Sequence, residues 1–274
     1  MSTTITAPSD NISQVRTPST TRPFGLVRHS LALAKRSLIK TRRTPEQLLD
    51  VTLQPIMFVV LFVYLLGGAV AGSTHDYLQF MLPALLTMQV TFASVQTGIN
   101  LNDDIKKGVF DRFRSMPIAR SAPLIGSVLG DVIRYVISIV VLLGFGSLVG
   151  FRIETDPMSA LAACLLVMFF AFCMSWIFVL LGMLVREPGA VQGIGFLALF
   201  PLTFGTNLLA PTDTLPGWLQ AWVDVNPLTQ VMAAARGLMV DGPVAGPVIH
   251  TLLWSIGLLA VFFPLAVRAY RRRT

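Results

Sequence analysis

The residues of this chain that could do chemistry are mostly amides placed within long apolar segments. Gln89, Gln96 and Asn100 recur at helical spacings within residues 77–100, and Asn207 lies in another apolar segment. Amides exposed to lipid would leave their hydrogen bonds unmade, so we expect these side chains to face protein or a water-filled path. They either hydrogen-bond between helices, including across a dimer interface, or contact a transported substrate along a translocation path.

Asp131 and Arg134 place two opposite charges within a further apolar segment. Residues three apart on a helix are neighbours, so the two can form a local ion pair. Charges within a membrane are costly and often functional. Both residues lie towards one end of the segment, however, and a long arginine side chain can extend to the interface. A structural ion pair is therefore the simpler interpretation.

One strongly charged segment, LNDDIKKGVFDRFRSMPIARS at residues 101–121, separates two apolar segments. Its apolar residues share one helical face, and its basic residues lie around them. We predict a short cytoplasmic helix over residues 103–116, ended by Pro117. It is either a solvated connector at the membrane surface or a surface on which a soluble partner acts. The candidate partner-docking residues are Ile105, Val109, Arg112, Phe113, Arg114 and Met116.

The motifs of the common enzyme classes are missing from the sequence. It contains no P-loop, no GxSxG and no HExxH, and its three histidines lie in separate regions. Cys164 and Cys173 form no metal-binding pattern. We therefore expect a chain that is not an enzyme and that holds no cofactor or metal of its own. A secondary transporter or channel is the alternative, although the sequence shows no mid-membrane acid and no evident inverted repeat.

Composition requires these residues to be positioned by membrane-spanning helices. The chain has 274 residues, of which 54% are hydrophobic and 13% charged, and its formal net charge is +7. Such a composition, with apolar runs of about 20 residues, predicts an all-α integral membrane protein. We predict six spans, of which the fifth is either complete or re-entrant. They cover about 51–70, 77–100, 128–149, 158–185, 190–209 and 248–267.

The segments around the spans differ in character. Residues 1–23 are rich in Ser, Thr and Pro and predict a disordered tail, whereas residues 24–43 predict an amphipathic helix lying in the interface. The transmembrane domain would occupy residues 44–274. Between the fifth and sixth spans we expect a short helix near Trp218 and Trp222, followed by a helix that Asn226 caps. Both helices should lie outside the cell.

Basic residues predict the orientation. With six spans, 18 of the 21 Lys and Arg residues fall in the N-terminal region, residues 101–121, the turn at Arg186 and the C-terminus, all on one side. The positive-inside rule then places both termini in the cytoplasm. The basic isoelectric point has the same explanation, so no nucleic-acid partner is implied.

Four segments together resemble the ABC-2 type transporter permeases of the daunorubicin-resistance kind. They are PEQLLDVTLQPIMFVVLFVYLLGG at 45–68, GVFDRFRSMPIARS at 108–121, FPLTFGTNLLAPTDTLPGWLQAW at 200–222 and NPLTQVMAAARGLM at 226–239. The chain departs from the family pattern at Lys106 and Lys107, where a glutamate commonly precedes the glycine.

The resemblance implies a function and its partners. Such permeases are multi-pass proteins of the bacterial plasma membrane and act as a pair, here expected to be a homodimer, with two copies of a separate ABC ATP-binding subunit. That subunit holds ATP and Mg²⁺, and the assembly exports hydrophobic drugs, antibiotics or lipids. Residues 101–121 correspond to the coupling element of the family, and residues 24–43 to its interfacial connecting helix.

Overall fold

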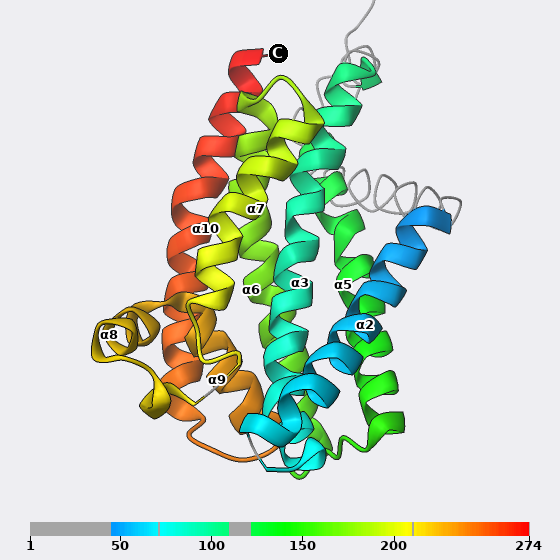
Figure 1. Ribbon diagram of the computed structural model, residues 1–274. Coiled ribbons are helices and arrows are strands. Elements are labelled where there is room, and N and C mark those ends of the chain that lie inside the picture. The colour runs from blue at the N-terminus through cyan, green and yellow to red at the C-terminus, as the bar shows by residue number, and fades with distance from the viewer. Residues whose placement is uncertain (1–44, 71, 110–121, 210, 274) are drawn as a thin grey trace, which may run out of the picture.

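A computed structural model describes residues 45–70, 72–109, 122–209 and 211–273, and within them the chain is all-helical. The long helices lie side by side in an elongated bundle (Figure 1). The tail predicted at residues 1–23 and the helix predicted at 24–43 lie outside the described residues. The helices are α2 (Pro45–Val70), α3 (Thr74–Lys106), α5 (Ala122–Val149), α6 (Pro157–Leu184), α7 (Pro188–Phe204), η1 (Thr212–Thr214), α8 (Gly217–Val225), α9 (Pro227–Met239) and α10 (Ala245–Arg273).

Helix α3 is the central helix of the bundle, and it packs against α2, α5, α6, α7 and α9. It is the least apolar of the long helices because protein, and not lipid, covers most of its surface. Two of its buried hydroxyl groups donate within the helix: Thr87 donates to the carbonyl oxygen of Pro83 at 3.1 Å, and Thr91 to that of Thr87 at 2.7 Å. Such bonds let hydroxyl-bearing residues lie inside an apolar bundle.

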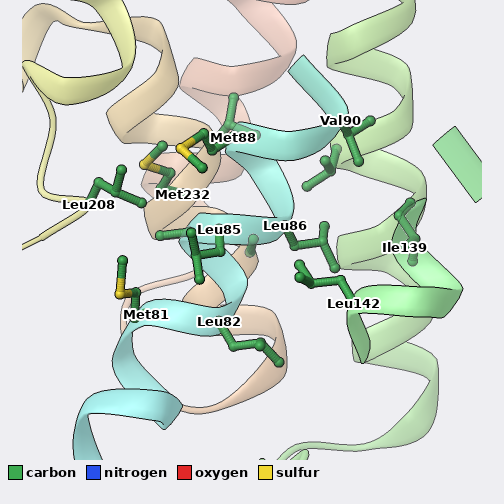
Figure 2. Packing of buried hydrophobic residues seen from close by; sticks show 14 of the residues in the cluster. Met81, Leu82, Leu85, Leu86, Met88, Val90, Ile139, Leu142, Leu208 and Met232 are labelled. Atoms are coloured by element: carbon green, nitrogen blue, oxygen red, sulfur yellow. The ribbon is translucent and has the colours of Figure 1, made fainter. Parts of the chain in front are cut away.

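The apolar core extends from both sides of α3 (Figure 2). Leu82 and Leu86 lie on the side of Ile139 and Leu142 from α5, whereas Leu85 lies on the side that faces α9 and the segment after α7. The largest fully buried side chains of this apolar core include Tyr77, Met81, Tyr135, Phe151 and Phe170. Helix α3 is therefore held by apolar contacts around most of its circumference.

Two glycines allow α3 and α6 to approach closely. A Cβ atom on Gly98 would lie 2.3 Å from the carbonyl oxygen of Phe178, and one on Gly182 would lie 2.4 Å from that of Gly98. Real Cβ atoms are not found at such distances, so neither position accepts a side chain without moving a helix backbone. The pair fixes where the two helices cross.

The helices extend the predicted spans at several ends. Among the described residues, four helices are long and apolar enough to cross a membrane: Thr74–Lys106, Leu124–Val149, Pro157–Leu184 and Ala245–Tyr270. The other two predicted spans correspond to shorter apolar helical segments, Thr52–Gly68 of α2 and Pro188–Phe204 of α7. A multi-pass membrane protein is confirmed at this level, and the count of six spans stays a prediction.

The two ends of the bundle differ chemically. One end carries exposed basic residues and is called the basic end: Lys106, Lys107, Arg186, Arg268 and Arg272. The opposite end carries α8, on which Trp218 and Trp222 are 76% and 48% exposed, and is called the tryptophan end (Figure 1). The predicted helix after Asn226 is present as α9, and the Asn226 side chain caps it by accepting from the Leu228 backbone N–H at 3.0 Å.

Candidate functional site

A polar cavity of about 100 Å³ lies between α2, α3, α5 and α7. The helices around it are apolar, yet half of its lining residues carry polar side chains. The apolar wall includes Phe92 and Phe196, whose ring centroids lie 5.3 Å apart. The polar lining consists of Gln54, Gln89, Gln96, Arg134, Ser138 and Gln192.

The predicted amide group is only partly brought together. Gln89 and Gln96 line the cavity, and Gln96 Nε2 donates to Asn100 Oδ1 at 3.2 Å, so Asn100 lies beside it. Asn207 does not belong to this site, because it follows the end of α7 at the tryptophan end, and its backbone carbonyl oxygen lies 3.5 Å from Arg236 Nη2. These four residues were grouped because an amide exposed to lipid is costly, and that cost does not predict where along the bundle each residue lies.

Arg134 and Asp131 are both buried, each with 5% of its surface exposed. Arg134 Nη1 lies 4.0 Å from Asp131 Oδ1, which is an ion-pair distance and longer than a hydrogen bond. In the described part of the chain, Arg134 Nε and Nη1 and Gln89 Nε2 have no hydrogen-bond partner. A buried polar group left without a partner costs about 1–3 kcal/mol, so these three donors need an explanation.

A second functional region is the end of α3, where the charged segment begins. Residues 101–106 continue α3, and Gly108 then adopts φ +65° while its N–H donates to the Ile105 carbonyl oxygen at 3.1 Å. The helix predicted over residues 103–116 is thus interrupted at its start, because glycine ends a helix readily in this left-handed conformation. Ile105 and Val109 are half-buried. Arg112, Phe113, Arg114 and Met116 lie outside the described residues.

Asn102 joins this end of α3 to the turn between α6 and α7. Its buried amide nitrogen donates to the carbonyl oxygens of Gly182 at 2.8 Å and Val185 at 2.7 Å. Lys106 also pairs with Glu187 in the same turn. Sequence reasoning missed Asn102. The one available signal was that α6 ends at 185–188 without a glycine, which leaves its last carbonyl groups in need of another donor.

Lys107 is held on α3 itself and does not reach the turn. Its Nζ donates to Asp103 Oδ2 at 2.6 Å, and this hydrogen bond raises the pKa of Lys107. The two adjacent lysines therefore have different partners: Lys106 links α3 to the start of α7, and Lys107 stabilises the last turn of α3.

Arg236 of α9 is held within the bundle by α3. Its Nε donates to the Phe80 carbonyl oxygen at 3.0 Å, and its guanidinium carbon lies 3.9 Å from the centre of the Phe80 ring. A cation over an aromatic ring is stabilised by the ring quadrupole. Arg236 thus ties α9 to α3 near the tryptophan end.

Comparisons with known proteins cover most of the chain. The family described as "ABC-2 type transporter" matches residues 28–240. The chain is 43% identical to the daunorubicin resistance ABC transporter permease protein DrrB1 of Streptomyces coeruleorubidus, over 87% of the chain and 84% of the relative. It is 26% identical to the probable doxorubicin resistance ABC transporter permease protein DrrC of Mycobacterium tuberculosis, over 98% of both chains. The doxorubicin resistance permease protein DrrB of the same organism is 30% identical over 75% of the chain and 73% of the relative.

Proposed function

Because the chain belongs to the ABC-2 type transporter family, we propose that it is the permease subunit of an ATP-driven exporter of a hydrophobic drug, antibiotic or lipid. The observation that carries the proposal is the 43% identity with a permease named for daunorubicin resistance, over 87% of the chain. The polar cavity within an apolar bundle supports it, because an amphipathic compound crossing the membrane needs polar contacts on its way.

The energy source would lie on another subunit. The sequence has no P-loop, so this chain alone would neither bind nor hydrolyse ATP. ATP and Mg²⁺ would be held by a separate ABC ATP-binding subunit, present in two copies. A second copy of this permease would complete the assembly. The exposed apolar side chains of α2 and α7, such as Leu65 at 67% and Leu197 at 77%, leave surface for lipid or that second copy.

The orientation follows from the charge distribution. The basic end of the bundle would face the cytoplasm, and the tryptophan end would face outward. Both termini would then lie in the cytoplasm of a bacterial cell.

The end of α3 suits the coupling role. Ile105 and Val109, together with Arg112, Phe113, Arg114 and Met116, would dock against the ATP-binding subunit. A displacement of the end of α3 by that subunit would be transmitted to α6 and α7. Asn102 and Lys106 would transmit it, because they connect α3 to the turn between those two helices. Helices α3 and α7 both line the cavity, so the same displacement would change its shape.

Reconstitution in proteoliposomes tests the proposal. The full chain is co-expressed with the ABC ATP-binding subunit encoded beside it and purified as a complex, and daunorubicin movement is followed by its fluorescence. We expect transport that requires ATP, Mg²⁺ and both subunits. The matched control carries a replaced P-loop lysine in the ATP-binding subunit and should be inactive.

Two results would contradict the proposal. Transport by this chain alone, driven by a proton or sodium gradient without ATP, would make it a secondary transporter. Stoichiometric ATP binding by the purified chain would contradict the assignment of ATP to a partner.

A further inference from the structure

The polar cavity contains more hydrogen-bond donors than the described residues can satisfy. Arg134 and Gln89 are 5% and 6% exposed, and both line the cavity. Arg134 Nε, Arg134 Nη1 and Gln89 Nε2 have no partner among the described residues. All three atoms carry hydrogen and none accepts, so whatever completes this cavity must bring acceptor atoms.

The size of the cavity indicates how much of a ligand it can take. A single water needs about 10–15 Å³ on this measure, so a cavity of about 100 Å³ admits several water-sized groups but not a whole drug molecule. The rest of the molecule would lie against the apolar part of the wall. Phe92 from α3 and Phe196 from α7 form that part, with a tilt of 35° between the two rings.

The charge of Asp131 indicates whether the ligand's acceptor group is an anion or an uncharged oxygen. Asp131 Oδ1 lies 4.0 Å from Arg134 Nη1 and already supplies a negative charge beside the guanidinium group. A full anion is therefore not needed to compensate Arg134, and it would be repelled by the neighbouring carboxylate. An uncharged oxygen acceptor, such as a carbonyl or quinone oxygen, avoids that repulsion while still accepting from several N–H groups.

We propose that Arg134 and Gln89 form a substrate subsite that hydrogen-bonds an uncharged carbonyl or quinone oxygen of an amphipathic aromatic compound. The inference rests on the proposed export function and names the substrate chemistry that the permease recognises. Arg134 and Gln89 would bind the oxygen, and Phe92 and Phe196 would contact the apolar ring system. Asp131 would act as a positioning residue that holds the guanidinium group of Arg134.

Binding to the full chain in phosphatidylcholine nanodiscs tests the proposal, with daunorubicin as the probe because it carries quinone oxygens on a fused-ring system. Arg134→Gln alone would break the buried ion pair with Asp131 and destabilise the protein. The decisive variant is therefore Asp131→Asn with Arg134→Gln, which removes both charges together and keeps the side chains close in size. We expect it to fold, as shown by a cooperative thermal transition, and to weaken daunorubicin binding at least tenfold.

Two single variants complete the test. Gln89→Met removes the amide donor at nearly constant volume and should weaken binding about threefold to tenfold. The matched control is Gln230→Met on α9, where the amide donates to the Asp224 carbonyl oxygen at 3.1 Å and lies outside the cavity. Its binding should equal that of the wild type.

The inference is overturned by any of three results. If the double variant binds daunorubicin as the wild type does, Arg134 serves only to pair with Asp131, and water satisfies its free donors. If the wild-type chain fails to bind daunorubicin, no carbonyl subsite exists. If added phosphatidylglycerol displaces daunorubicin from the wild type but not from the double variant, the subsite belongs to an anionic lipid. Retained, Arg134-dependent binding without ATP-driven transport would instead contradict the proposed function and leave the subsite standing.

Discussion

Asn102 is a single buried side chain whose amide group joins two helices. Its nitrogen donates to two carbonyl oxygens at the end of α6, and those carbonyl groups have no helical partner of their own. Glycine usually ends a helix by turning the chain back on itself, but here a side chain from α3 does the capping. Asn102 therefore stabilises the end of α6 and also connects α6 to the end of α3. The end of α3 is the segment proposed to dock against the ATP-binding subunit.

Replacing Asn102 with leucine should lower both stability and coupling. The change removes two hydrogen bonds and leaves buried carbonyl groups without donors, at a cost of about 1–3 kcal/mol. We expect a melting temperature lower by several degrees in detergent, and more ATP hydrolysed per molecule exported. The control is Asn100→Leu, because Asn100 is only half-buried and accepts a single bond from Gln96. Equal melting temperatures and equal coupling ratios for the two variants would contradict the linking role of Asn102.

Periodicity identified some functional residues and could not identify others. Gln89 and Gln96 recur on one helical face, so their common position in the cavity was predictable from α3 alone. Asn102 and Arg236 act through partners about 80 and 156 positions away in sequence, and no local pattern encodes those contacts. The unpartnered N–H groups of Arg134 could not be predicted either. The i,i+3 spacing predicted an ion pair with Asp131 but not the 4.0 Å distance between Arg134 Nη1 and Asp131 Oδ1, which is too long for a hydrogen bond.

At the scale of helices, the crossing of α3 and α6 is set by backbone contact. Gly98 and Gly182 meet with so little space that a methyl group at either position would overlap a carbonyl oxygen of the other helix. Apolar runs in the sequence predicted the long helices in general. They did not select this pair, because the two glycines lie on different helices and belong to no common motif.

Gly182→Ala should force α3 and α6 apart. Its Cβ atom would meet Gly98 O at 2.4 Å, and overpacking of this kind costs about 1–3 kcal/mol. The matched control is Gly144→Ala on α5, where a Cβ atom would have no neighbour within 4 Å and alanine favours the helix. Thermal unfolding of the two purified variants should show a loss for Gly182→Ala only. A loss of the same size in both would mean that the crossing is not responsible.

The end of α3 depends on Gly108. The sequence predicted a helix across residues 103–116 because apolar spacing continues through this point, and periodicity does not register a left-handed residue. Gly108→Ala should destabilise this turn by about 1 kcal/mol, whereas Gly108→Asn should be tolerated better, because asparagine adopts a positive φ more readily. The ratio of ATP hydrolysis to transport in the reconstituted complex measures the effect. Equal ratios for the two variants would show that the left-handed turn is dispensable.

For the whole molecule, the contrast between the basic end and the tryptophan end predicts the topology. Single cysteines are introduced at Asp241, near the tryptophan end, and at Arg186, at the basic end, after Cys164 and Cys173 are replaced with alanine. An impermeant maleimide added to intact cells should label position 241 and leave position 186 unlabelled until the membrane is opened. Labelling of position 186 from outside would invert the proposed orientation.

Composition was sufficient to predict the class of the fold and the approximate place of each long helix. It was insufficient for their lengths, because helices such as α3 and α10 continue into polar residues that hydropathy assigns to loops. The short helices α8 and α9 were predictable from the Pro-Gly and Asn-Pro pairs that begin them. The packing of these two helices was not predictable from the sequence. The side chain of Asn226 also donates to the carbonyl oxygens of Leu202 and Gly205, and these long-range bonds hold the start of α9 against the end of α7.

The brevity of α7 has a consequence for the lipid around the protein. Its 17 residues rise about 25 Å at 1.5 Å per residue, less than the hydrocarbon thickness of about 30 Å in a typical bilayer. If α7 crosses the membrane as predicted, the bilayer beside it must become thinner, or the helix must be flanked by other protein, to avoid hydrophobic mismatch. In the proposed orientation, the exposed indoles of α8 would lie at the outer interface of the membrane. Acyl-chain length should therefore regulate this protein, with export fastest in bilayers thinner than those that match α3.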